Sequence, residues 1–204
     1  MAPIRGTMLL PLDAASYRQH LARHTFLARA NKGSTQPDPR LALTRLVEDQ
    51  VRQALAQPLG ATPWRVLRWE QPDPANRYRP CYRELDGVFK AADGRTVLLE
   101  VKASASKNSL KGGLAQLRAA VDTARHAHPG AVGLLCVADL GAWYDEFGEA
   151  ATWPVQDWFA DKDVTLLPWP PRWPEGPTAG LCVCVVPDEV LGGWLPPEPE
   201  RAIS

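Results

Sequence analysis

The segment of residues 83–104, RELDGVFKAADGRTVLLEVKAS, places charged side chains inside two apolar stretches that are typical of buried strands. Asp93-Gly94 lies between these stretches and predicts a tight hairpin turn. In the second strand alternate side chains share a face, so Glu100 and Lys102 point the same way. The turn brings Asp86, in the first strand, close to Glu100. Because a buried charge is costly unless it is paired or bound to a metal, these residues indicate a site.

Two carboxylates that lie side by side repel each other unless a proton or a cation lies between them. A hard divalent cation such as Mg²⁺, which prefers oxygen ligands, is the simplest candidate. The backbone carbonyl of Val101, between the two charged residues of the second strand, supplies a further oxygen. A Glu-x-Lys pair on a strand is more commonly a solvent-facing pair, and on the motif alone this alternative stays open.

The elements around the hairpin follow a regular order. Apolar residues recur at helical spacing in residues 39–60 and 109–130. Strand patterns occupy residues 63–71, 81–89, 96–104 and 131–140. The order helix, three strands, helix, strand predicts an α/β fold with a mixed central sheet flanked by helices. Residues 180–195 add one more strand, and residues 14–30 have a helical pattern.

Composition divides the chain into three regions. Residues 1–40 are predicted to be an N-terminal helical extension that ends in a loop at 31–40, and residues 41–140 form the core. Residues 141–204 are acidic and rich in Trp and Pro, and we expect them to pack on the core, with a frayed tail at 196–204. Beyond residue 137 the only basic residues are Lys162, Arg172 and Arg201, so a phosphate-binding surface fits the earlier part of the chain.

The composition disfavours membrane proteins and zinc sites. The chain has no apolar run of about 18 residues, and its N-terminus lacks the apolar segment of a signal peptide, so a cytoplasmic protein with no membrane partner is expected. The four cysteines form no CxxC pair, and Cys182 and Cys184 alternate within an apolar run. They are typical of small strand residues in a reducing compartment.

The arrangement resembles the PD-(D/E)xK nuclease superfamily, whose restriction-endonuclease-like core has the order helix, three strands, helix, strand. Asp86 matches the metal-binding Asp of that pattern, and Glu100–Lys102 matches its ExK. Glu48, in the first helix, matches an acidic residue that many members carry, although Asp49 beside it is an alternative. Gln116, in the second helix, resembles the Gln of the RecB-like and nuclease-related branches.

The resemblance covers about residues 40–140, and two positions depart from the family pattern. Leu85 precedes Asp86 where the name of the superfamily has Pro. Ala120 stands where the RecB-like branch usually has Tyr, so the branch is left open.

The resemblance implies a nuclease that hydrolyses phosphodiester bonds, in DNA above all, with Mg²⁺ or Mn²⁺ as its cofactor. It implies that Asp86, Glu100 and the Val101 carbonyl hold the metal, with Glu48 bound directly, through water or through a second ion. Whether such a nuclease cuts from an end or internally stays open.

Two further residues have roles implied by the resemblance. Lys102 stands beside the phosphate and orients the attacking water or helps to deprotonate it. Gln116 bonds to Lys102, to a ligand or to the nucleic-acid backbone. The basic residues that follow the site and suit phosphates are Lys107, Lys111, Arg118 and Arg125.

Other readings stay open beside this one. The chain is alternatively a catalytically silent nuclease fold that binds nucleic acid or protein. It is also compatible with a structural subunit or a homodimer, in which the C-terminal Trp/Pro-rich region docks the partner. We expect Glu84 to be structural and paired with Arg83 or Lys90, and His126 and His128 to be structural at a helix C-terminus.

Overall fold

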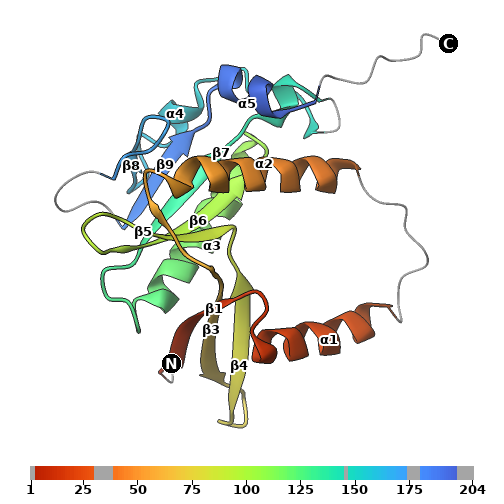
Figure 1. The fold of residues 1–204 in the computed structure, drawn as a ribbon, viewed down its shortest axis with the longest axis vertical. Helices are drawn as coiled ribbons and strands as arrows, with labels where there is room; N and C mark the ends of the chain where they lie inside the picture. The colour runs from red at the N-terminus through yellow and green to blue at the C-terminus, as the bar shows by residue number, and fades with distance from the viewer. Residues whose placement is uncertain (1–2, 30–38, 145–146, 174–179, 197–204) are drawn as a thin grey trace.

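The computed structural model describes residues 3–29, 39–144, 147–173 and 180–196. The loop expected at 31–40 lies outside these residues except for its last two, which begin a helix. The tail expected at 196–204 lies outside them except for Pro196. Figure 1 shows a larger, helix-flanked sheet and a smaller sheet accompanied by one helix.

The larger sheet has six described strands in the spatial order β2-β5-β6-β7-β9-β8. β2 and β5, and likewise β5 and β6, pair antiparallel, whereas the remaining pairs are parallel. The prediction of an α/β fold with a mixed central sheet flanked by helices is confirmed. The strands are β2 (Gly60–Ala61), β5 (Gly87–Lys90), β6 (Thr96–Lys102), β7 (Val132–Val137), β8 (Thr165–Leu166) and β9 (Leu181–Val185).

The hairpin between β5 and β6 turns where Asp93-Gly94 predicts it. Gly94 has a φ of 83°, a left-handed conformation that Gly adopts without steric cost. Its N–H donates to the Ala91 carbonyl at 2.8 Å. The Asp93 carboxylate accepts a hydrogen bond from the Arg95 N–H at 3.0 Å, so a backbone bond and a side-chain bond both stabilise the turn.

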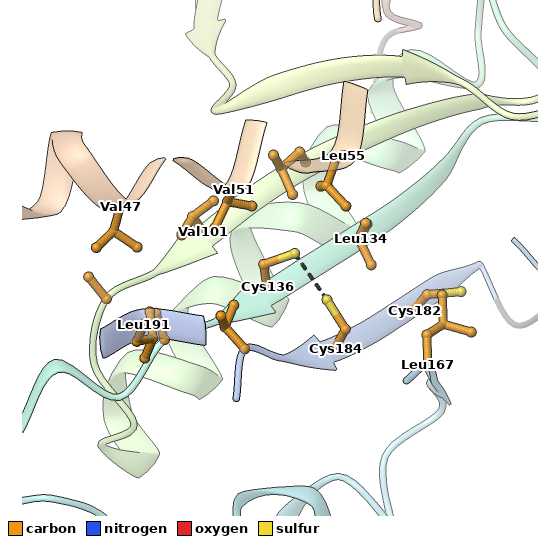
Figure 2. Packing of buried hydrophobic residues seen from close by; sticks show 14 of the residues in the cluster. Val47, Val51, Leu55, Val101, Leu134, Cys136, Leu167, Cys182, Cys184 and Leu191 are labelled. Atoms are coloured by element: carbon orange, nitrogen blue, oxygen red, sulfur yellow. Dashed lines mark hydrogen bonds between the residues drawn. The ribbon is translucent and has the colours of Figure 1, made fainter. Parts of the chain in front are cut away.

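Helices cover both faces of the central sheet. One face is covered by α2 (Pro39–Ala56) and α5 (Asp188–Trp194), the other by α3 (Lys107–Ala124) and α4 (Val155–Trp158). Figure 2 shows Val47, Val51 and Leu55 of α2 near strand residues such as Leu134. Their four-residue spacing places them on one side of the helix, and all three are fully buried. Burying each such side chain contributes about 1.5–3 kcal/mol.

On the opposite face, α3 packs through an apolar stripe that includes Leu110, Leu114 and Leu117. Ser106 caps the helix, because its hydroxyl accepts a hydrogen bond from the Ser109 N–H at 3.2 Å. Gly133 of β7 permits close packing of the helix, since a Cβ at that position would lie 2.7 Å from Leu117 Cγ.

The smaller sheet contains three antiparallel strands, β1 (Arg5–Pro11), β3 (Trp64–Pro72) and β4 (Tyr78–Glu84), in the order β1-β3-β4. The strand predicted at 63–71 therefore lies outside the central sheet. The strand predicted at 81–89 divides at Leu85-Asp86, where the chain passes from β4 into β5. The two halves pair with different strands, β4 with β3 and β5 with β2 and β6.

The N-terminal region also differs from its expected helical structure. It begins with β1, and α1 (Ala15–Arg29) follows. Every residue of β1 is partly or fully exposed, so β1 is not a buried strand. Its partner β3 lies far along the chain, and the periodicity of a short segment does not predict such a long-range pairing.

The region after residue 140 adds strands to the central sheet. β9, which the sequence predicts, pairs with β7 over Leu181–Val185, and β8 pairs with β9. A short 3-10 helix, η1 (Leu140–Ala142), follows β7. Among the described residues, no helix has the length and apolar character needed to cross a membrane.

Candidate functional site

The site forms where β6 continues beyond its pairing with β5. β5 begins at Gly87, which is opposite Leu99, whereas β6 extends to Lys102. The Asp86 N–H donates to the Leu99 carbonyl at 3.2 Å, and its carboxylate accepts a hydrogen bond from the Val101 N–H at 2.6 Å. In an extended strand the N–H and carbonyl of one residue face the same edge. The Val101 carbonyl therefore faces the same open edge as the Asp86 carboxylate.

Two arginines hold the backbone at the crossing between the sheets. Arg52 of α2 donates to the Asp86 carbonyl at 2.7 Å, and Arg65 of β3 donates to the Leu85 carbonyl at 3.2 Å. The Leu85 N–H in turn donates to the Arg65 carbonyl at 2.7 Å. The position of Asp86 is therefore determined by side chains from two elements outside the hairpin.

Lys102 lies between the hairpin and α3. Its Nζ is 2.5 Å from Glu100 Oε1 and donates to Gln116 Oε1 at 3.1 Å. Gly113 of α3 makes room for the lysine stem, because a Cβ there would lie 2.9 Å from Lys102 Cγ and 3.0 Å from Lys102 Cε. The structure thus brings Glu100, Lys102 and Gln116 together, as the sequence predicts, and adds Gly113 to them.

A cavity of about 240 Å³ opens beside these groups and is lined by Glu48, Asp86, Glu100, Val101 and Lys102, among others. Glu48 faces this cavity from α2. Its neighbour Asp49 instead pairs with Arg52 and is exposed. Of the two carboxylates that the sequence left open, Glu48 is the one at the site.

Negative charge accumulates in the cavity. Burial raises the pKa of Asp86 to about 7, and the carboxylates of Glu100 and Glu48 add to the increase, against the Val101 N–H and Lys102. Burial also raises the pKa of Glu48, against the lowering effect of Arg52 and Arg65. Burial and the neighbouring carboxylates therefore outweigh the Val101 N–H and Lys102, which favour the ionised form of Asp86.

The donor chemistry suits a hard divalent cation. Asp86, Glu100 and Glu48 offer carboxylate oxygens and Val101 a carbonyl oxygen, which are the ligands that Mg²⁺ and Mn²⁺ prefer. Within the described residues, no three His, Cys, Asp or Glu side chains are already gathered to hold an ion. The Lys102 ammonium donates a hydrogen bond to one oxygen of Glu100, and the Val101 N–H donates one to an oxygen of Asp86. A cation would compete with these partners.

Glu84 has a structural role, with partners other than Arg83 and Lys90. It accepts a hydrogen bond from the Tyr17 hydroxyl at 3.0 Å and lies 3.4 Å from the Arg65 guanidinium. Burial, followed by the charge of Glu84, raises the pKa of Tyr17 to about 12. Arg83 instead donates to the backbone carbonyl of Gln116 and so links β4 to α3.

Sequence reasoning missed Arg52, which holds Asp86, and Gly113, which accommodates Lys102. A signal for the first was present, because Arg52 lies four residues after Glu48 on α2 and therefore shares its side of the helix. Gly113 carried no such signal, since a glycine inside a helix identifies a close contact only when its neighbour is known.

Comparisons of the chain with family models, with curated proteins and with solved structures gave no match.

The raised pKa of Asp86 leads to a prediction about how the stability of the protein depends on pH. Its folded-state pKa of about 7 lies above the ordinary value of 3.8, so ionisation destabilises the folded protein progressively as the pH rises between these values. Asp86→Asn should therefore stabilise the cation-free protein by roughly 2 to 4 kcal/mol at pH 8 and by little near pH 4. Urea denaturation of both proteins at each pH measures the difference.

Asp93→Asn is the matched control, because Arg95 lowers the pKa of Asp93 and its neutralisation should not stabilise the protein at any pH. Millimolar Mg²⁺ should raise the melting temperature of the wild type and have a smaller effect on Asp86→Asn. A variant that is destabilised at pH 8 would mean that the Asp86 carboxylate only supports the fold.

Gly113→Ala should displace the Lys102 stem. Alanine favours the helix by about 1 kcal/mol, but the contact with Lys102 is too short and overpacking costs about 1–3 kcal/mol. Gly112→Ala is the control, since nothing lies within 4 Å of a Cβ there, and it should stabilise the protein. In a Lys102→Ala background Gly113→Ala should lose most of its cost, as measured by urea denaturation. Equal stabilities of the two single variants would exclude the steric account.

Proposed function

We propose that the chain is a nuclease of the PD-(D/E)xK type, which hydrolyses phosphodiester bonds with the help of Mg²⁺ or Mn²⁺. One observation carries the proposal. The Asp86 carboxylate bonds to the Val101 N–H at the open edge of β6, beside Glu100 and Lys102 of the same strand. The expectation of DNA as the substrate comes from the sequence resemblance.

The proposed roles follow from the chemistry of each side chain. Asp86, Glu100, the Val101 carbonyl and Glu48 would hold the cation, which when bound acidifies water and stabilises charge on the phosphate. Lys102 supplies a positive charge beside the phosphate and orients the attacking water. Because Gln116 bonds to Lys102 independently of Glu100, the ammonium would keep a partner if Glu100 bound a cation.

The distribution of charge supports a polyanionic substrate. Residues 1–137 contain 20 Lys and Arg against 11 Asp and Glu, whereas residues 138–204 contain 3 against 12. The site residues all lie within residues 1–137, the part of the chain with a positive net charge. α3, which carries Gln116, has Lys107, Lys111 and Arg118 before its first acidic residue, Asp122. Basic residues attract phosphates in a salt-dependent manner, although Arg118 lines a separate cavity with Asp122 and Arg125.

Cleavage should require Mg²⁺ or Mn²⁺, and Ca²⁺ should support binding without turnover, because Ca²⁺ is larger and acidifies bound water less. Gel assays with labelled single-stranded and duplex DNA, and with RNA of the same sequence, test each cation. Cleavage that continues at the same rate in excess chelator would rule out the metal-dependent mechanism.

Lys102→Ala should lower kcat by about 10²–10⁴ while nucleic-acid binding changes little, because the lysine acts in the reaction step. Lys162→Ala is the control, since Lys162 pairs with Asp161 in the C-terminal region. Normal turnover by Lys102→Ala would refute the role of Lys102. Salt-sensitive binding by a wild type that cleaves none of the substrates would instead favour the silent nuclease fold.

A further inference from the structure

α1 is a basic helix, whose sequence contains three arginines, two histidines and no Asp or Glu. Arg18 and Arg23 are exposed, and among the described residues neither makes an ion pair. Positive charge without interspersed carboxylates attracts polyanions. The exposed side of α1 therefore fits a polyanion such as nucleic acid.

A ladder of four aromatic rings joins this helix to β4, and it consists of Tyr17, Tyr82, His20 and His24. The ring centroids of Tyr17 and Tyr82 are 5.7 Å apart. Those of Tyr82 and His20 are 4.5 Å apart, and those of His20 and His24 are 4.3 Å apart. Tyr17 is only 4% exposed, whereas His24, at the other end, is exposed. The ring ladder therefore ends in a solvent-exposed ring, and aromatic rings attract further planar rings.

The inner part of the ring ladder is fixed in position. The Tyr17 hydroxyl donates to Glu84 at 3.0 Å, which holds α1 against β4. Burial, followed by the charges of His24 and Arg23, lowers the pKa of His20. At neutral pH His20 therefore packs on Tyr82 as an uncharged ring. Because the rings are already ordered, a ligand that stacks on the outer end has little side-chain entropy to remove.

The ring ladder lies close to the candidate site. Besides burial, the charge of Glu84 helps to raise the pKa of Glu48, so the partner of Tyr17 is near the cavity. Tyr82 precedes Asp86 by four residues, and at most about 14 Å of chain separates them. In Figure 1, α1 and α2 extend to the same side of the molecule, with the junction of β4 and β5 between them in this view. A strand bound along α1 therefore leads toward the site.

We propose that α1 binds a single-stranded segment of nucleic acid, with one base stacked on His24 and backbone phosphates beside Arg18 and Arg23. This inference rests on the proposed nuclease function and adds the class of substrate to it. Stacking on an exposed ring requires an unstacked base, which single strands offer and the interior of a duplex does not. Every base has a π-face, so binding of this kind tolerates any sequence.

The first test compares His24→Ala with His126→Ala, a control whose side chain is also exposed but follows the end of α3. Binding of a labelled single-stranded oligonucleotide is measured by fluorescence anisotropy in a Lys102→Ala background with Mg²⁺. His24→Ala should weaken binding about 5- to 10-fold, and His126→Ala should change it little. His24→Phe, which keeps a ring, should bind within about twofold of the parent. Equal affinities of the two alanine variants, or a full loss in His24→Phe, would overturn the stacking contact.

A ligand series separates the base from the backbone. An abasic single strand, which has phosphates but no bases, should bind the parent more weakly than the ordinary strand, and His24→Ala should cause no further loss. A blunt duplex of the same length should also bind more weakly and independently of His24. A duplex that binds as tightly as the single strand, with the same dependence on His24, would overturn the preference for single strands.

The phosphate contacts are tested by the salt dependence of binding. Arg18→Ala and Arg23→Ala should each reduce the slope of log K against log salt concentration by about 0.7. Arg172→Ala is the control, because Arg172 is exposed in the acidic C-terminal region, and its slope should stay that of the parent. Unchanged slopes in both α1 variants would contradict the contacts with the backbone.

Binding and cleavage together distinguish this inference from the proposed function. In the cleaving protein, His24→Ala should raise KM for single strands and leave kcat within about twofold, because α1 contacts the substrate away from the reacting group. Cleavage of single strands with an unchanged KM in His24→Ala would refute the role of α1 and leave the nuclease function standing. His24-dependent binding by a wild type that cleaves nothing would refute the nuclease function and support the role of α1 in binding.

Discussion

β6 runs past the end of its partner β5, and the Asp86 carboxylate takes the hydrogen bond that a neighbouring strand would have taken at Val101. This side chain closes the exposed edge of an interior strand. As a result, the Asp86 carboxylate is held near Glu100 in a partly buried position, where burial and like charge both raise its pKa. The remaining features of the site keep that carboxylate in place or compensate its charge.

α2 serves both the core and the site, because it carries two different stripes of side chains. Val47, Val51 and Leu55 attach it to the sheet, as Figure 2 shows. On another side, Glu48 faces the cavity and Arg52 bonds to the Asp86 backbone. Since both stripes repeat every four residues, docking of the apolar stripe also determines where the polar one lies. Packing energy from the core thus positions charged groups that would not converge by themselves.

Much of the site was predictable because its signals are local. The alternation in residues 96–102 places Glu100 and Lys102 on one face, and Asp93-Gly94 determines the hairpin that brings Asp86 near. Gln116 was selected from the family resemblance alone, and in the structure it accepts a hydrogen bond from Lys102. The partners of Glu84 were mispredicted, because Tyr17 and Arg65 come from elements that meet it only in the folded chain. Arg52 and Gly113 were missed because each acts through a side chain or backbone group from another element.

The sequence by itself determined the types of most elements and the faces of the hairpin, since periodicity and turn chemistry act over a few residues. Only the tertiary structure decided which sheet each strand joined. Residues 81–89 read as one strand, yet they divide at Leu85-Asp86 between two sheets, and the unpredicted β1 completes the smaller one. Strand pairing depends on partners far along the chain, and no local pattern records them. The same long-range pairing leaves the end of β6 open, and that open end is where the charged residues meet.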